Sequence, residues 1–368
     1  MFSEGERTAA VDLVDRGHAL PSWWYTDPEV FRREQQRIHR RGWHYVVDTG
    51  ALADVGDNHL SDIAGVPIVV VRDRTGTIRG FVNICRHRAH PVVLEAGNRK
   101  HLQCHYHGWS YELDGSLLRA PRAEREPEPI DLSGCGLIPV QVAVWGPMVW
   151  ANVDLDAPAF EEWIAGLPEL MKSHGFDAHD NVAGPSHTWD IRCNWKVFQD
   201  NTIECYHCPT THPEFARLVA MDPAVQELAV GGRFWIHHRI PFREGVDLGG
   251  LLPPGAQYHY NWIFPGTYLQ YYGPNFDVGS VRAVAPDRIR FTHTTFVPAA
   301  TSARRIAALQ SLLEEDATIH QDVDICHRVQ AAHEADVAPP GRLIPNAEHL
   351  LTHLYRVGLE LLAPEDAG

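Results

Sequence analysis

The sequence predicts an α+β protein of two domains, an all-β domain followed by a domain that mixes helices and strands. Residues 43–155 contain short β-like runs separated by turn signals and no long helical pattern, which is typical of a small sandwich or barrel. Residues 156–368 combine strand-like runs with helical periodicity, including a long helical pattern near the end. We assign residues 1–42 to an N-terminal helical segment that packs on the second domain.

The individual elements follow from local signals. A first helix is expected over residues 27–41, where Asp27 can cap the helix and Pro28 suits its first turn. In the all-β domain, strands are expected over 67–72, 81–84, 111–113, 140–144 and 148–153. In the second domain, helices are expected over 158–166, 169–174, 193–207, 303–332 and 347–362, with several strands between 231 and 297.

Composition excludes several classes of function. The chain has 368 residues, of which 44% are hydrophobic, so it can bury a large core. Its net charge of −15 lacks the basic footprint of a nucleic-acid-binding protein. No apolar run approaches the roughly 20 residues needed to cross a bilayer, and residues 1–17 lack the apolar core of a secretory signal. We therefore expect a soluble cytoplasmic protein without a nucleic-acid or membrane partner.

The all-β domain contains two short motifs that pair a cysteine with a histidine. Residues 83–90 read NICRHRAH and residues 104–109 read CHYHGW. One residue separates Cys85 from His87, and two separate Cys104 from His107. Two thiolates on one iron and two imidazoles on the other are the ligands of a Rieske [2Fe–2S] cluster.

A structural zinc site is the alternative for these four residues, because two cysteines and two histidines also suit tetrahedral zinc. Zinc fingers usually separate a C-x-x-C pair from an H-x₃₋₅-H pair, whereas each half here mixes one cysteine with one histidine. Chance proximity of four metal-capable residues is the third interpretation.

A second candidate site lies in the stretch NWKVFQDNTIECYHCPTTHP, residues 194–213. Glu204 and His207 are three residues apart and would share one face of a helix. Pro209 disfavours a helical conformation at Cys208, so the helix should end there and His212 should return from the following turn.

Iron(II) that activates O₂ prefers two histidines and one carboxylate on one face of its coordination sphere. The carboxylate must come from elsewhere, and spacing does not choose among the acidic residues of the long helix. These are Glu314, Glu315, Asp316, Asp322 and Asp324. Ordinary structural histidines are the alternative to a metal site.

In combination, these motifs resemble the α subunits of Rieske ring-hydroxylating oxygenases. The resemblance extends from Trp43 through CRHRA and CHYHGW to NWK…N…ECYH….HP and a C-terminal D-x-x-I-C-x-x-V-Q. It implies an N-terminal Rieske [2Fe–2S] domain and a helix-grip catalytic domain, an antiparallel sheet with helices, that holds mononuclear Fe(II).

Carried over by position, the resemblance implies that His207, His212 and Asp322 bind the iron, with Asp324 as the competitor for Asp322. It places Asn201 beside the iron pocket. It also implies that the Glu204 carboxylate bridges His207 to a cluster histidine, His107, of a neighbouring subunit.

Such a chain would be the oxygenase component of a multicomponent enzyme. It would use O₂ as co-substrate, take electrons from a reductase or ferredoxin, depend on NAD(P)H only through that reductase, and form a homotrimer. Two positions depart from the usual pattern. His105 replaces a proline, and the bridging residue is Glu204 where ring dioxygenases usually have aspartate.

Glutamate at this position resembles the branch that oxidises quaternary and methylated amines such as carnitine, glycine betaine and stachydrine. We therefore expect hydroxylation of such an amine, with oxidative N-demethylation or C–N cleavage. The alternative reaction is hydroxylation or O-demethylation of an aromatic or natural-product substrate. The non-enzymatic alternative is a pure electron carrier or a zinc-stabilised binding domain. The aromatic-rich residues 258–276 could form a cation cage or simply one buried face of a strand.

The remaining cysteines show no pattern of their own, and buried free thiols are the default interpretation. They are Cys135, Cys193, Cys205, Cys208 and Cys326. His237 and His238 lie in a strand-like run and are expected to be structural.

Overall fold

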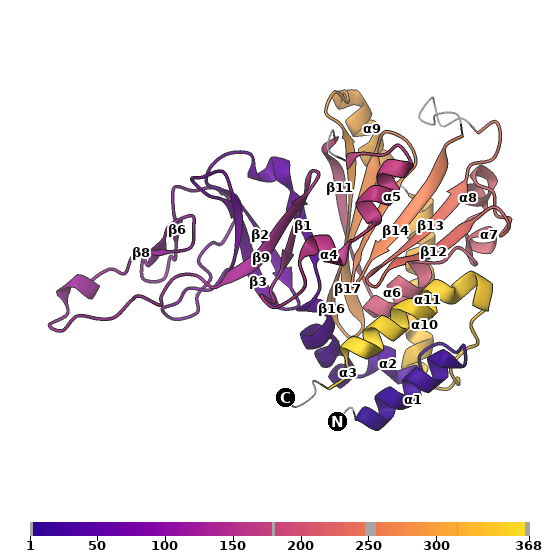
Figure 1. Cartoon of the computed structure of the whole chain (residues 1–368), viewed down its shortest axis with the longest axis horizontal. Coiled ribbons are helices and arrows are strands. Elements are labelled where there is room, and N and C mark those ends of the chain that lie inside the picture. The colour runs from indigo at the N-terminus through magenta and orange to yellow at the C-terminus, as the bar shows by residue number, and fades with distance from the viewer. Residues whose placement is uncertain (1–2, 179–180, 247–254, 315, 365–368) are drawn as a thin grey trace. The chain divides into compact units, whose positions relative to one another are not determined.

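The computed structural model describes residues 3–178, 181–246, 255–314 and 316–364. The chain divides into two compact units (Figure 1). One unit is Arg40–Ala157, and the other combines Met1–His39 with Pro158–Gly368. The predicted α+β organisation is confirmed, because the first unit is built on strands and the second on one large antiparallel sheet with helices.

The unit Arg40–Ala157 contains a seven-stranded antiparallel sheet in the order β1-β10-β9-β4-β3-β2-β5 and a small sheet, β6-β7-β8. The strands are β1 (His44–Asp48), β2 (Asp57–Ile63), β3 (Val66–Arg72), β4 (Ile78–Val82), β5 (Gly97–Asn98), β6 (Leu102–Gln103), β7 (Ser110–Tyr111), β8 (Leu117–Arg119), β9 (Pro139–Trp145) and β10 (Met148–Asn152). Four consecutive residues of β3, Ile68 to Val71, are buried, so both faces of this strand are covered. Val69 and Val71 belong to the core cluster that also contains Cys85 and Cys104.

The second unit is organised around a seven-stranded antiparallel sheet in the order β11-β17-β16-β15-β14-β13-β12. The strands are β11 (Asn181–Ile191), β12 (Glu227–Gly232), β13 (Trp235–Pro241), β14 (Gln257–Ile263), β15 (Thr267–Tyr271), β16 (Phe276–Ala285) and β17 (Arg288–Pro298). Successive side chains of a strand point to opposite faces, so this sheet has two distinct surfaces.

Helices of the second unit come from both ends of the chain. They are α1 (Glu4–Asp15), α2 (Trp23–Thr26), α3 (Pro28–Glu34), α4 (Phe160–Trp163), α5 (Leu167–Ser173), α6 (Trp195–Thr202), α7 (Cys208–Thr211), α8 (Pro213–Leu218), α9 (Ala303–Glu314), α10 (Ala317–Ala335) and α11 (Pro345–Leu361). The N-terminal α1 packs on α11, and α2 packs on α10. Figure 1 shows α1, α2, α3, α10 and α11 gathered near one end of the sheet, α9 near the other end, and α5 lying across the sheet.

Three predicted helices are wrong in extent. The helix expected over 158–166 is only α4, Phe160–Trp163. The helix expected over 193–207 is only α6, which ends at Thr202; Pro209 then lies in the first turn of the new helix α7 rather than ending the old one. The helix expected over 303–332 is divided into α9 and α10, because Asp316 has an extended backbone and its side chain accepts from the amides of Thr318 and Ile319.

The helices α6 and α10 are tied together at their ends. Asn194 caps α6 by accepting from the amide of Lys196 at 3.0 Å. The amide of Asn194 itself donates to the Gln330 side chain of α10 at 2.8 Å. This contact fixes the spacing between two helices that both carry residues of the candidate site.

A buried ion pair joins the N-terminal segment to the same helix. Lys196 Nζ lies 2.6 Å from Glu34 Oε1, and the two side chains are 5% and 1% exposed. The indole of Trp195 donates to the other Glu34 oxygen at 2.8 Å.

None of the helices among the described residues is long and apolar enough to cross a membrane.

Candidate metal centres and active site

The two Cys/His motifs form two loops of the same design. The amide of Cys85 donates to the carbonyl of His90, and the Ala89 amide donates back to Cys85. In the second loop, the amide of Cys104 donates to Trp109, and the Gly108 amide donates back to Cys104. Ala89 and Gly108 have positive φ angles of 56° and 75°, so each loop turns back sharply four residues after its cysteine.

The four predicted cluster residues differ in exposure. Cys85 and Cys104 are buried at 4% and 1%, whereas His87 and His107 are exposed and their ring centroids lie 4.6 Å apart. Two inner sulfurs and two outer imidazoles are the arrangement that a Rieske cluster requires.

Hydrogen bonds around the sulfurs also fit a cluster. The Tyr111 hydroxyl lies 3.3 Å from Cys85 Sγ. Burial raises the pKa of Cys104, whereas hydrogen bonds from the amides of Tyr106 and His107 to its sulfur lower it, and the net shift is upward. Donors directed at sulfur stabilise bound thiolates, so these loops can hold an iron–sulfur cluster.

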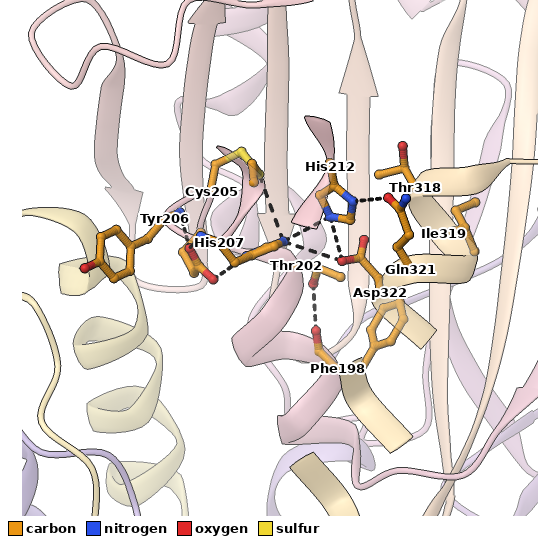
Figure 2. Close-up of polar contacts among 12 residues, drawn as sticks. Phe198, Thr202, Cys205, Tyr206, His207, His212, Thr318, Ile319, Gln321 and Asp322 are labelled. Carbon is orange, nitrogen blue, oxygen red and sulfur yellow. Dashed lines mark hydrogen bonds and ion pairs between the residues drawn. A yellow bond between two sulfur atoms is a disulfide. The ribbon is translucent and has the colours of Figure 1, made fainter. Parts of the chain in front are cut away.

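The second candidate site brings together His207, His212 and Asp322 (Figure 2). His207 Nε2 lies 3.2 Å from His212 Nε2, and Asp322 Oδ1 lies 2.9 Å from His212 Nε2 and 3.5 Å from His207 Nε2. Their elements are far apart in the sequence, since the histidines flank α7 and Asp322 lies on α10.

Partners on the far side of each ring fix its tautomer. His207 Nδ1 lies 2.5 Å from Glu204 Oε1, and His212 Nδ1 lies 2.7 Å from Gln321 Oε1. Both acceptors are oxygens, so both Nδ1 atoms donate and both Nε2 atoms present lone pairs toward the Asp322 carboxylate. Three acceptors converging within 3.5 Å are stabilised by a cation between them. The donor set therefore fits a two-histidine, one-carboxylate iron site.

Electrostatics agree with a cation site. Burial lowers the pKa of His207, but Asp322 and Glu204 outweigh this effect and raise it to about 9. Burial likewise lowers the pKa of His212, and the Asp322 carboxylate again produces a net upward shift. The negative potential that favours a proton here also favours a divalent metal, which competes with that proton.

Glu204 is held by backbone as well as by His207. Its Oε2 accepts from the amides of Tyr206 and His207, and its Oε1 faces the His207 ring. Glu204 therefore contacts His207 without a shared helix face, because the segment 203–207 is irregular and not the predicted helix.

Two of the five remaining cysteines are not free thiols, which corrects the default interpretation. Cys205 and Cys208 form a disulfide, with their Cα atoms 4.9 Å apart. Cys205 lies in the segment between α6 and α7, and Cys208 is the first residue of α7. Cys193 and Cys326 are buried free cysteines, as expected, whereas Cys135 is only partly buried.

The structure separates the acidic residues that spacing left equivalent. Asp322 joins the histidines, whereas Asp324 is exposed and binds Arg328 at 2.8 Å. Asp316 caps α10, and Glu314 is exposed at the end of α9. Glu315 lies outside the described residues.

Gln321 was not predicted, although it precedes Asp322 directly and orients His212. A glutamine beside an acidic residue has no distinctive spacing. Only the position of α10 against α7 reveals its role.

A cavity of about 350 Å³ opens beside the three metal-binding candidates. Asn201 lines this cavity, and its side-chain oxygen is buried with no hydrogen-bond partner among the described residues. In the aromatic-rich stretch 258–276, the aromatic residues on one face of β14 and β15 line the cavity together with Tyr272. These are Tyr258, Tyr260, Tyr268 and Tyr272.

Other aromatic residues of that stretch are buried in the hydrophobic core. Trp262, Phe264 and Phe276 are buried at 1% exposure or less and do not line the cavity. Phe198, Phe215, Phe242 and Phe291 also line the cavity, so a third of its described lining residues are phenylalanine or tyrosine.

Comparison with known proteins identifies the class. A family model for the Rieske [2Fe-2S] domain matches residues 42–142, and one for the ring hydroxylating alpha subunit (catalytic domain) matches residues 178–363. A chloroplastic choline monooxygenase of Amaranthus tricolor is 27% identical over 348 residues, covering 93% of this chain and 77% of that protein. The carnitine monooxygenase oxygenase subunit of Escherichia coli (strain K12) is 30% identical over 257 residues, covering 68% of this chain and 66% of that protein.

Solved structures share the fold. The quaternary ammonium Rieske monooxygenase CntA in complex with γ-butyrobetaine superposes with a TM-score of 0.82 at 21% identity, covering 96% of this chain and 99% of that one. Naphthalene 1,2-dioxygenase from Rhodococcus sp. superposes with a TM-score of 0.83 at 20% identity, covering 100% of both chains.

The protein is thus an O₂-dependent oxidoreductase of the Rieske non-haem iron class. The chain belongs to the ring-hydroxylating oxygenase α-subunit family. The predicted resemblance is confirmed, and so are the two cofactors, a Rieske [2Fe–2S] cluster and a mononuclear iron, which removes the zinc alternative. Proteins of this class take electrons from a donor protein and act on a small molecule.

Proposed function

We propose that this oxygenase hydroxylates a small quaternary or methylated amine whose cationic group lies in the aromatic cavity. Iron in such a site supplies O₂ activation when bound. We assign it to His207, His212 and Asp322, and the cluster to Cys85, His87, Cys104 and His107. The donor geometry and the exposure pattern described above support both assignments.

The charge of the cavity wall carries the substrate proposal. Its described lining residues include the carboxylates of Glu204, Asp316 and Asp322 but no lysine or arginine. His238 also lines it, and burial lowers the pKa of this histidine to about 3, so it is neutral. An aromatic wall without a cation favours an ammonium group, which ring faces attract by roughly 2 kcal/mol when desolvated.

The same wall disfavours a substrate carboxylate. His293 lines the cavity, but its ring lies 3.2 Å from the Asp277 carboxylate, which already occupies it. A substrate anion would therefore enter without a partner. We propose an uncharged alcohol or alkyl group as the remainder of the substrate, as in choline, rather than a carboxylate, as in carnitine. Choline and carnitine are the substrates in the names of the relatives.

In the proposed reaction, one oxygen atom of O₂ enters a C–H bond and the other leaves as water, using two electrons from the donor protein and two protons. If the hydroxylated carbon is an N-methyl group, its C–N bond breaks to give formaldehyde and the demethylated amine. The Asn201 side-chain oxygen is buried beside the site, has no hydrogen-bond partner in the described part of the chain, and is available to orient the substrate.

We further propose that Glu204 links His207 to His107 of a neighbouring chain, as the exposure of His107 on its loop allows. This role requires an oligomer, and a homotrimer in the cytoplasm stays our prediction.

A substrate panel tests the proposal. Substrate-dependent O₂ uptake and product mass would be measured with choline and other carboxylate-free quaternary amines, with carnitine and betaines, and with aryl methyl ethers. We expect turnover with the first group, and Asp322→Ala enzyme provides the background. Preferred turnover of carnitine would overturn the carboxylate argument, and preferred turnover of aryl ethers would overturn the amine assignment.

A further inference from the structure

A cluster of three histidines lies on the sheet face opposite the aromatic cavity. On β14, Tyr258 and Tyr260 line the cavity, so His259 between them points to the other side. On β13, His238 lines the cavity and His237 points away from it. Both outward histidines meet His174, which follows α5 on that face.

Each of these histidines offers a ring nitrogen, and the three nitrogens lie within 4.8 Å of one another. His237 and His259 are buried at 1% and 5%, and His174 is partly exposed. An ion could thus reach the cluster from solvent along the His174 side.

The tautomer of His237 is fixed by its neighbour. The Asn261 amide nitrogen donates to the carbonyl of Leu269 at 3.2 Å, which leaves Asn261 Oδ1 to accept from His237 Nδ1 at 2.8 Å. His237 Nε2 therefore carries a lone pair, and it is buried without a hydrogen-bond partner among the described residues. A buried acceptor with no donor is costly unless something binds it.

The other two histidines show related features. His259 Nδ1 is also buried and unpartnered in the described structure. The Tyr271 hydroxyl lies 2.9 Å from His174 Nδ1 and orients that ring. Outer hydrogen bonds of this kind commonly orient the histidines of metal sites.

We propose that His174, His237 and His259 form a second metal site, distinct from the iron site, for a borderline divalent transition ion such as Zn²⁺. Three neutral imidazoles with an open fourth position are an established zinc ligand set. The ion would connect the end of α5 to strands β13 and β14. It would lie across the sheet from the catalytic cavity.

The rival interpretation is an aromatic stack. His259 stacks on Tyr271 with centroids 4.6 Å apart and planes at 11°, and His174 stacks on His259 at 4.2 Å and 27°. Stacking alone would account for the ring positions but leaves the unpartnered nitrogens of His237 and His259 without a role.

Zinc stoichiometry separates the two. Iron-loaded protein would be dialysed against Zn²⁺, freed of unbound metal and measured by mass spectrometry of its metals. Because the first site could also take zinc, the key protein is the double variant His207→Ala/His212→Ala, which lacks that site. We expect about one zinc ion per chain in both proteins, with three imidazole nitrogens at about 2.0–2.1 Å by X-ray absorption.

Variants of the cluster complete the test. His174→Ala, made in the double variant, removes the partly exposed ligand and should abolish zinc binding and any zinc-dependent rise in Tm. His259→Phe preserves stacking on Tyr271 and should also abolish zinc binding and the rise in Tm. His187→Ala changes a histidine of β11 and should alter neither zinc binding nor Tm. Zinc bound equally by His174→Ala or His259→Phe protein, or no zinc bound by the double variant, would overturn the proposal.

Discussion

Asp322 Oδ1 lies 2.9 Å from His212 Nε2, although 110 residues separate the two in the chain. The contact depends on the position of α10 against the turn that holds the histidines. The proposed metal site is therefore complete only when the C-terminal half of the catalytic unit has folded around it.

Replacing Asp322 with alanine should remove the mononuclear iron and leave the cluster intact. The two remaining imidazoles would lack the charge that neutralises the ion. Iron content should fall from about three to about two atoms per chain, with the visible spectrum of the cluster unchanged and turnover lost.

Asp324→Ala is the matched control, because Asp324 lies two residues further along α10 but is exposed and paired with Arg328. Its iron content and activity should equal those of the unmodified protein. Loss of iron from Asp324→Ala rather than from Asp322→Ala would contradict the ligand assignment.

Glu204→Gln should retain both metal centres and still lose activity. The amide can accept from the backbone amides of Tyr206 and His207, but it lacks the charge that supports His207. Changes to residues that hold a metal-binding histidine commonly cost 10–100-fold, and we expect turnover to fall by about this factor.

Rapid reduction followed by mixing with O₂ would show whether the loss lies in electron delivery. The cluster in Glu204→Gln should reduce normally and reoxidise slowly. Glu214→Gln, at an exposed position of α8, should behave as the unmodified protein does. Unchanged reoxidation in Glu204→Gln would refute the proposed link.

Tyr258→Leu should weaken substrate binding more than Tyr258→Phe does. Tyr258 and Tyr272 line the cavity with ring centroids 6.1 Å apart, so a cation beside them would contact two ring faces. Loss of one face should raise KM for a quaternary amine about tenfold.

Tyr258→Phe keeps the ring and loses only the hydroxyl contact to Gln270. It should therefore have a KM close to that of the unmodified protein. Equal effects of the two changes would show that the hydroxyl, not the ring face, matters.

Glu34→Met should be strongly destabilising, because it leaves the buried ammonium of Lys196 without its partner. Removing one member of a buried ion pair typically costs about 3–5 kcal/mol. The double change Glu34→Met/Lys196→Met should recover much of this loss in denaturant unfolding. Asp324→Ala breaks an exposed pair and should have little effect.

Asp200 should make stability depend on pH. Burial raises the pKa of Asp200 to about 7, although hydrogen bonds from Tyr355 and Tyr25 and the charge of Lys196 oppose this shift. The folded state then holds a proton that the unfolded state, with an ordinary value of 3.8, has released. Stability contributed by this group therefore falls as pH rises toward 7 and levels off above it.

Asp200→Asn removes this dependence. The free energy of unfolding of the variant, minus that of the unmodified protein, should be about 2 kcal/mol larger at pH 8 than at pH 5.5. Chemical denaturation at both pH values gives the comparison, and a constant difference would rule out the shifted titration.

Local motifs were predictable and long-range ones were not. The cluster loops depend on residues a few positions apart, so spacing alone indicates a metal or cluster site at Cys85, His87, Cys104 and His107. Asp322 was chosen from five acidic residues only by family resemblance, because its partners are fixed by the packing of α10. Gln321 was missed for the same reason.

Errors in the predicted helices had specific causes. The stretch 193–207 has helical composition, but the chain leaves the helix after Thr202 and the Glu204 side chain binds backbone amides instead. The same misjudged helix end concealed the true geometry of His207, which lies outside α6 and directly before α7. The break at Asp316 was an unrecognised N-cap.

The two faces of strand β14 contribute side chains to two different sites. Tyr258 and Tyr260 face the catalytic cavity, and His259 faces the histidine cluster. A single inserted residue near the start of this strand would exchange the two faces, placing an imidazole in the cavity and a phenol among the histidines. Evolution can therefore vary each face by substitution at alternate positions, but a change of length in β14 would damage both sites at once.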